Sequence, residues 1–223
     1  MVSVIQKTGT LERSPSLGGL IMFRKIIILV FAISLLTQSK LSWSENYDFR
    51  FTRWGMNQEE VIASEEKMDP VEKNEDLIRY KTRILRKNVE LHYLFSEDRL
   101  VGAIYKLDDN YLNSEHFIQT YIEFKEALMK KYGQPSSDTT NWLNDTYKNE
   151  RKKWGLALSL GHVEYASLWK TQNTAIECSL GEVNYYVLCL VEYWNTEYSH
   201  LSKEIKLGDK LDIIKKEDKF DPF

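Results

Sequence analysis

Two runs of alternating apolar and polar residues, 77–107 and 163–194, constrain the fold of this chain more than any other feature. Successive side chains of a strand point to opposite faces, so this alternation predicts strands with one face in a core. The first run has a turn signal at Glu97-Asp98-Arg99. The second run divides into three expected strands, Val163–Lys170, Thr174–Leu180 and Tyr185–Trp194. Each run therefore predicts a three-stranded antiparallel meander.

Two segments predict helices that pack on these strands. Asn57 as N-cap and Glu60 three positions later form a capping box, which predicts a short helix over Gln58–Glu66. Residues Ser114–Tyr132 carry apolar side chains at helical spacing, and Gly133 is suited to end that helix. We therefore expect the α+β class, with an antiparallel sheet built from two helix-plus-three-strand meander units and with the helices packed on the sheet.

Three further segments are assigned less directly. A short strand is expected over Tyr47–Trp54, because aromatic and polar residues alternate there. A polar linker is expected over Ser136–Asn141. The segment Asn149–Leu160 favours a helix, although its alternating leucines leave a strand open.

The two cysteines, Cys178 and Cys189, fall on neighbouring expected strands. A register that pairs Trp169 with Thr174, and Cys178 with Cys189, keeps the apolar residues on one face. An even number of cysteines in an exported protein favours a disulfide. The sequence therefore predicts a structural bridge between these two cysteines.

The basic and then apolar stretch at 23–36 is typical of a secretory signal peptide. We expect the signal peptide over 22–44, with cleavage before Glu45 and a periplasmic or secreted product. The apolar run is shorter than the roughly 20 residues of a spanning helix, so a retained anchor is the weaker alternative. No cysteine lies near the cleavage site, and we expect no stable membrane anchor after cleavage. Residues 1–21 have no role in export, and we expect them to be a misannotated leader that precedes a start at Met22.

The expected mature chain is mildly acidic. Of the 30 basic and 33 acidic residues of the whole chain, five basic and one acidic residue precede residue 45, which leaves a net charge of −7. Nucleic acid is therefore not an expected partner, because proteins that bind it usually carry a basic surface. The mature chain is expected to form a single domain over 45–202, with halves 45–112 and 113–202, and a charged, mobile tail over 203–223.

The segment Trp54-Gly55-Met56-Asn57-Gln58-Glu59-Glu60-Val61 resembles the helix start of small exported bacterial modules that pack helices on an antiparallel sheet. The outer-membrane assembly lipoprotein BamE family and the β-lactamase-inhibitor-protein-like domains are of this kind. The chain also resembles uncharacterised exported bacterial proteins. The resemblance to the first two families implies a binding or assembly role in the envelope without catalysis. The cysteine that carries the lipid in the BamE family is absent, so membrane tethering does not follow from it.

Residues that could carry catalysis do not form a recognisable motif. None of the histidines, His92, His116, His162 and His200, has the spacing of a metal site. A His162-Glu164 pair on one strand face could act in acid–base chemistry, but an exposed strand face explains it more simply. No nucleotide- or phosphate-binding loop is present. We therefore expect no metal and no cofactor.

The last strand is apolar on both faces, which is the feature with most functional promise. If its other residues face the core, then Tyr186, Leu188, Leu190 and Trp194 form a patch on the opposite side. Either the segment Asn149–Leu160 or the N-terminal strand covers this patch, or the patch binds a partner or a second copy in a homodimer.

We therefore expect a non-catalytic exported binding or accessory module that acts on an envelope protein or peptide. The alternative is a periplasmic hydrolase or glycan-processing enzyme, whose carboxylates come from distant positions and leave no local motif.

Overall fold

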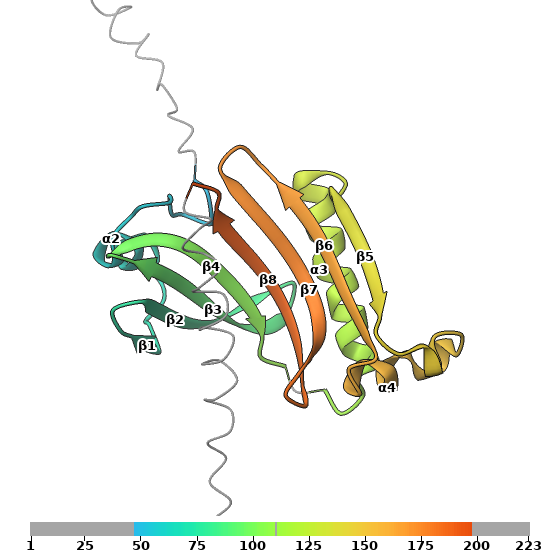
Figure 1. Cartoon of the computed structure of the whole chain (residues 1–223). Helices are drawn as coiled ribbons and strands as arrows, with labels where there is room; N and C mark the ends of the chain where they lie inside the picture. The colour runs from blue at the N-terminus through green and yellow to red at the C-terminus, as the bar shows by residue number, and fades with distance from the viewer. Residues whose placement is uncertain (1–46, 110, 198–223) are drawn as a thin grey trace, which may run out of the picture. The chain divides into compact units, whose positions relative to one another are not determined.

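The computed structural model describes residues 47–109 and 111–197 (Figure 1). Within them the chain forms one eight-stranded antiparallel sheet, in the order β1-β2-β3-β4-β8-β7-β6-β5. The strands are β1 Glu72–Lys73, β2 Leu77–Ile84, β3 Lys87–Ser96, β4 Arg99–Leu107, β5 Ser137–Trp142, β6 Val163–Lys170, β7 Thr174–Val183 and β8 Tyr186–Asn195. The helices are α2 Gln58–Ser64, α3 Glu115–Tyr132 and α4 Trp154–Ser159, with short 3-10 turns at Asp145–Tyr147 and Arg151–Lys153.

The α+β class and the antiparallel sheet are confirmed, and most of the fold is sheet. The first alternating run forms β2, β3 and β4, and the second forms β6, β7 and β8. The two groups join through β4 and β8 into one continuous sheet, and β1 and β5 extend its edges. The division into two helix-plus-three-strand units is not confirmed. Each half of the sheet has a fourth strand, β1 or β5.

Two of the expected segments were assigned wrongly. The expected linker contains an edge strand, β5, whose side chains are mostly exposed and therefore read as a polar loop. The expected strand Tyr47–Trp54 is a turn with a single bridge between Phe49 and Thr52. Its aromatic alternation arises because Phe49 is buried against Tyr93, while Phe51 is exposed.

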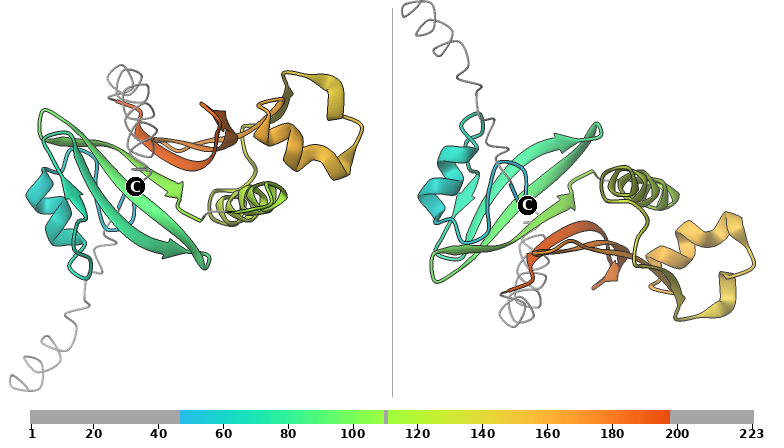
Figure 2. Two further views of the ribbon diagram at one scale, coloured as in Figure 1. Left: turned by 90° about the horizontal axis from the view of Figure 1, so that it is seen from below. Right: turned by 90° about the horizontal axis from the view of Figure 1, so that it is seen from above.

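The core lies on one face of the sheet, under all three helices (Figure 2). The expected stripe of α3 is confirmed at its centre, where Ile118, Tyr121, Phe124 and Leu128 are buried. The helix favoured for Asn149–Leu160 is confirmed as a shorter α4, preceded by a 3-10 turn. Figure 2 shows the sheet edge-on and gives a view of α2 and α3 beside it. We call the face that carries these helices the inner face and the other the outer face.

The capping box before α2 is also confirmed. The Asn57 side chain accepts a hydrogen bond from the Glu60 backbone N–H at 2.9 Å, and the Glu60 carboxylate accepts one from the Asn57 N–H at 2.9 Å. The first turn of α2 is thereby fixed.

The predicted strand registers are wrong by two residues. Trp169 pairs with Ile176 rather than Thr174, and Cys178 pairs with Val191 rather than Cys189. The positions of the turns are the physical reason. The expected strand ends leave 181–184 as the β7–β8 loop, but that hairpin turns at Asn184-Tyr185, both at positive φ. In the β6–β7 hairpin Lys170 pairs with Ala175, so that turn also lies further along the chain than expected. A shift of two residues keeps every side chain on its predicted face.

Candidate binding face and its polar network

The structure brings the four predicted site residues together on the outer face. Leu188, Leu190 and Trp194 are buried in a second apolar cluster, and Tyr186 packs against it half-buried. Leu94 of β3 and Ile104 of β4 complete this cluster, and Leu77 packs at its edge. We call Leu94, Ile104, Leu188, Leu190 and Trp194 the outer cluster.

The two segments expected to cover this patch lie elsewhere. Ala157 and Leu158 of α4 belong to the inner core, as does Phe49 of the N-terminal segment. The expectation that one of them shields the outer face was therefore wrong. Both segments reach the sheet from the side on which α3 packs, so their apolar side chains join the inner core.

Glycine shapes the floor of the outer cluster. Gly102 of β4 pairs directly with Trp194 of β8. A Cβ atom at position 102 would lie 2.6 Å from Cε3 and Cζ3 of the indole ring. The indole N–H donates a hydrogen bond to the Glu192 carboxylate at 3.0 Å. The Trp194 ring is thus held flat against the neighbouring strand.

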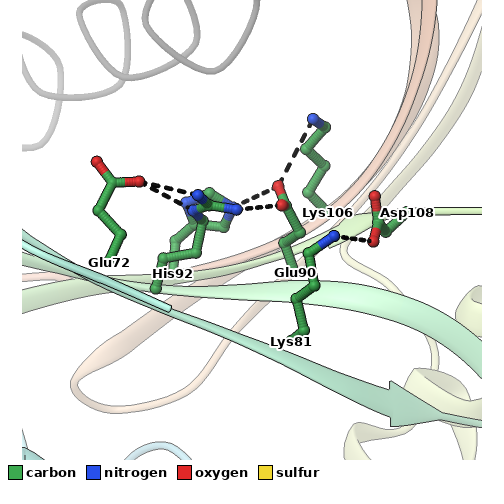
Figure 3. A network of polar contacts seen from close by, with 7 residues as sticks. Glu72, Lys81, Glu90, His92, Lys106 and Asp108 are labelled. Atoms are coloured by element: carbon green, nitrogen blue, oxygen red, sulfur yellow. Dashed lines mark hydrogen bonds and ion pairs between the residues drawn. The ribbon is translucent and has the colours of Figure 1, made fainter. Parts of the chain in front are cut away.

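A polar network borders the outer cluster (Figure 3). Arg79 of β2 forms ion pairs with the Glu72 carboxylate, at 3.0 Å, and with Glu90 of β3. The second Glu90 oxygen lies 3.4 Å from His92 Nε2 and 3.7 Å from Lys106 Nζ. Glu90, His92 and Lys106 are all buried. Glu90 and His92 alternate with apolar residues along β3, and alternation alone cannot distinguish a solvated charge from a covered one.

The protonation states of this network do not resemble those of a working acid–base pair. Burial alone would raise the pKa of Glu90, but contacts with His92, Lys106 and Arg79 lower it to about 2. Burial lowers the pKa of His92, although Glu90 opposes this shift. Efficient general acids and bases have pKa values near the working pH. An ionised Glu90 beside a neutral His92 therefore favours a structural network.

A groove with an acidic wall runs beside the outer cluster. Its volume is about 210 Å³, and it lies over β6, β7 and β8. Leu188 and Leu190 form part of its lining, together with three carboxylates, those of Glu164, Glu177 and Glu182. We call this feature the acidic groove. An apolar floor next to carboxylates suits a ligand that is apolar and positively charged.

A second hollow lies where β4 and β8 meet the start of α3, and we call it the end pocket. It measures about 450 Å³, and its lining includes Asp108, Asp109, Tyr111, Tyr185 and Tyr186. Tyr185 is 96% exposed and occupies a turn position with a φ of 70°. A large residue is uncommon at positive φ. Sequence reasoning missed this pocket because loop residues give no periodic signal.

The His162-Glu164 pair, considered above for acid–base chemistry, has a structural explanation. His162 stacks on Tyr147, with ring centroids 5.8 Å apart and an angle of 17° between the planes. Glu164 is exposed on β6 and lines the acidic groove. Within 47–109 and 111–197, no group of three or more His, Cys, Asp or Glu side chains is arranged to hold a metal ion.

Cys178 and Cys189 are buried and unbonded in the inner core. The predicted disulfide is therefore absent here. Burial raises the pKa of Cys178 to about 12, and it also raises that of Cys189. Both thiols are consequently protonated at neutral pH.

Several sequence-based expectations fall outside the described residues. These are the leader 1–21, the signal peptide 22–44, its cleavage site and the tail 203–223. Among the helices that the structure describes, none is long and apolar enough to cross a membrane.

Comparison of the chain with protein-family models, with curated proteins and with solved structures finds no match. The resemblance noted at Trp54–Val61 therefore stays a hypothesis, and a functional assignment has to come from the site itself.

Proposed function

We propose that this protein is an exported, non-catalytic binding module whose outer face takes up an amphipathic, lysine- or arginine-bearing peptide segment of an envelope protein. The observation that carries the proposal is the outer cluster together with the acidic groove at its side. Apolar anchors supply most of the free energy of such complexes, while charges set specificity and the rate of association. The signal peptide expected over 22–44 supports the envelope as the place of action.

The chemistry of the groove favours a cationic ligand over an anionic one. Glu164, Glu177 and Glu182 face the groove, and its lining includes no lysine or arginine. An anionic ligand would meet three like charges at short range. A peptide with leucine-like side chains spaced along one face and basic residues beside them would match both parts of the site.

The proposal is tested with synthetic peptides and a charge reversal. An amphipathic peptide with lysines on its polar face should bind the protein, and a peptide of the same apolar pattern with glutamates should not. Glu177→Lys should weaken binding by about tenfold or more, since it replaces attraction with repulsion. Glu126→Lys on the exposed surface of α3 is the matched control and should bind as the unchanged protein does. Equal affinity for both peptides, measured by calorimetry, would contradict the proposal.

Export is tested separately. The mature protein recovered from the medium or periplasm should begin at Glu45, and the unprocessed precursor should begin at Met22. An N-terminal sequence that includes residues 1–21 in the precursor would reject the leader hypothesis. Retention in the membrane fraction would reject cleavage.

The end pocket favours one alternative function, the binding or processing of a glycan. The exposed Tyr185 ring, with the half-buried Tyr111 and Tyr186 in the same lining, suits the apolar face of a sugar, and Asp108 and Asp109 could accept hydrogen bonds from sugar hydroxyls. Saturation-transfer NMR with short glycans would show contacts that disappear in Tyr185→Gly. The same experiment on Leu190→Ser would leave such contacts in place, which separates the two sites, because Leu190 lines the acidic groove and not the end pocket.

A further inference from the structure

The outer cluster is buried although no described helix or strand lies over it. Leu94 is 0% exposed and Ile104 is 1% exposed. All three helices that the structure describes belong to the opposite face. An open sheet face would leave such side chains in water, so a further segment has to cover them.

The covering segment can be identified from where the described chain ends. Strand β8 ends at Asn195, one residue after Trp194 of the outer cluster, and the described residues end at 197. The chain continues through 198–223, which is 26 residues. As a helix, this length corresponds to roughly 39 Å, and strands of ten residues such as β7 and β8 correspond to roughly 33 Å. The segment therefore begins beside the cluster and is long enough to run along it.

The composition of this segment fits the outer face. It contains apolar residues in two sets at helical spacing: Leu201 and Ile205 are four residues apart, and Leu207, Leu211 and Ile214 are four and three apart. It also contains six lysines, which would meet the carboxylates of the acidic groove. Six acidic residues are interspersed with them. The net charge is therefore neutral, and apolar contact has to supply most of the attraction.

We infer that residues 198–223 fold back over the outer face and occupy the peptide site of their own chain. This segment would then be a built-in competitor, and a partner peptide would bind by displacing it. The second statement rests on the proposed function, whereas the first does not. A tethered segment acts at an effective concentration near the millimolar range for a short linker, so it can hold the site even with weak contacts.

The first experiment uses the full mature chain and a photocrosslinker. Benzoylphenylalanine replaces Leu190 in the outer cluster, and mass spectrometry identifies the crosslinked peptides. Crosslinks within the monomer to 198–223 are expected. The matched control places the same group at Leu156, which is 48% exposed on α4, and should give no crosslink to that segment. Crosslinks to a second copy or to residues before 47, or none at all, would overturn the inference.

The second experiment measures competition. A chain that ends at Glu197 should bind the lysine-bearing test peptide at least about tenfold more tightly than the full chain, because the internal competitor is gone. It should also bind a synthetic 198–223 peptide added in trans. If the shortened chain does not fold, the full chain with Leu211→Asp and Ile214→Asp replaces it, and the same gain is expected.

The two experiments separate the two proposals. Crosslinking to 198–223 without any binding of the basic peptide would support the fold-back and reject the proposed function. Binding of the basic peptide without crosslinking, and with equal affinity in the full and shortened chains, would support the function and reject the fold-back.

Discussion

The indole ring of Trp194 lies directly against Gly102 on the neighbouring strand, so closely that there is no room for a Cβ atom at position 102. The contact joins β8 to β4, the two strands through which the halves of the sheet meet. It also fixes Trp194 as part of the floor of the outer cluster. The glycine is thus a packing requirement of the candidate site.

Replacing Gly102 by alanine should destabilise the protein by about 1–3 kcal/mol, because the added methyl group collides with a rigid, buried ring. Denaturant unfolding measures the change. Gly181→Ala is the matched control, since it lies on the same face and its added Cβ would meet Glu164 Cγ at 3.4 Å, an ordinary contact. Similar losses in both variants would show that the Trp194 contact is not the cause.

A second prediction concerns the attachment of the N-terminal segment to the sheet. The Arg50 guanidinium forms two hydrogen bonds with the Glu65 carboxylate, at 2.6 and 2.9 Å, and Tyr93 donates to the same carboxylate. The Glu65 side chain is 2% exposed and that of Arg50 22%. Glu65→Gln leaves a largely buried guanidinium without its counter-charge, and we expect a loss of about 2–3 kcal/mol, at the low end for buried pairs because Arg50 is partly hydrated.

The control for this prediction is a surface pair. Lys81 lies 3.0 Å from Asp108, and the two side chains are 58% and 35% exposed. Lys81→Ala should change stability by only about 0–1 kcal/mol. If Glu65→Gln costs no more than Lys81→Ala in chemical unfolding, the Arg50–Glu65 pair does not hold the segment in place.

Sequence reasoning predicted faces well and registers poorly, and one physical cause explains both. The face on which a side chain lies depends on its odd or even position along the strand. This alternation is visible in β8, so Leu188, Leu190 and Trp194 were assigned to one side correctly. Register depends on the turns, and the β7–β8 hairpin turns at Asn184-Tyr185 rather than over the expected loop 181–184. Edge strand β5 was missed because no face of it is buried.

The polar network was missed for a related reason. Glu90 and His92 alternate with apolar residues in β3, which reads as a solvated face. The sequence of β8 did contain a signal. Its outer face is apolar, which indicates that this face of the sheet is covered. The outer-facing charged residues of the other strands would then be buried as well and would have to pair with one another.

The buried thiols lead to a third prediction. Because Cys178 and Cys189 are diagonal rather than directly opposite neighbours, their Cα atoms are expected to be roughly 7–8 Å apart, beyond the usual span of a disulfide. In the folded protein both thiols should resist Ellman's reagent, and both should react in denaturant. A mass lower by two hydrogens in protein purified from an oxidising compartment would instead show the bridge predicted from the sequence. In that case the strands have moved closer together.

The fourth prediction is that the free energy of unfolding depends on pH because of the buried His92. Its pKa in the folded protein lies below the ordinary 6.5, because burial disfavours the charged ring. The unfolded chain therefore takes up a proton first, and stability falls as the pH drops below about 6.5, with a slope of at most about 1.4 kcal/mol per pH unit. Glu90, Lys106 and Arg79 are the charged groups beside the ring in the network of Figure 3. His92→Gln should flatten this slope between pH 6.5 and 4.5.

Glu90 affects the same measurement in a different pH range. Its pKa is lowered from 4.5 to about 2, so its contribution is present above pH 4.5 and is lost as the pH falls toward 2. Glu90→Gln should flatten the curve in that lower window, and it should also lower the pKa of His92 further, because Glu90 opposes the lowering that burial causes. His92→Gln acts above that window. Free energies of unfolding from urea titrations at half-unit pH steps would resolve the two. If His92→Gln leaves the slope between pH 6.5 and 4.5 unchanged, His92 is not held neutral in the folded protein, and the outer face is open to water.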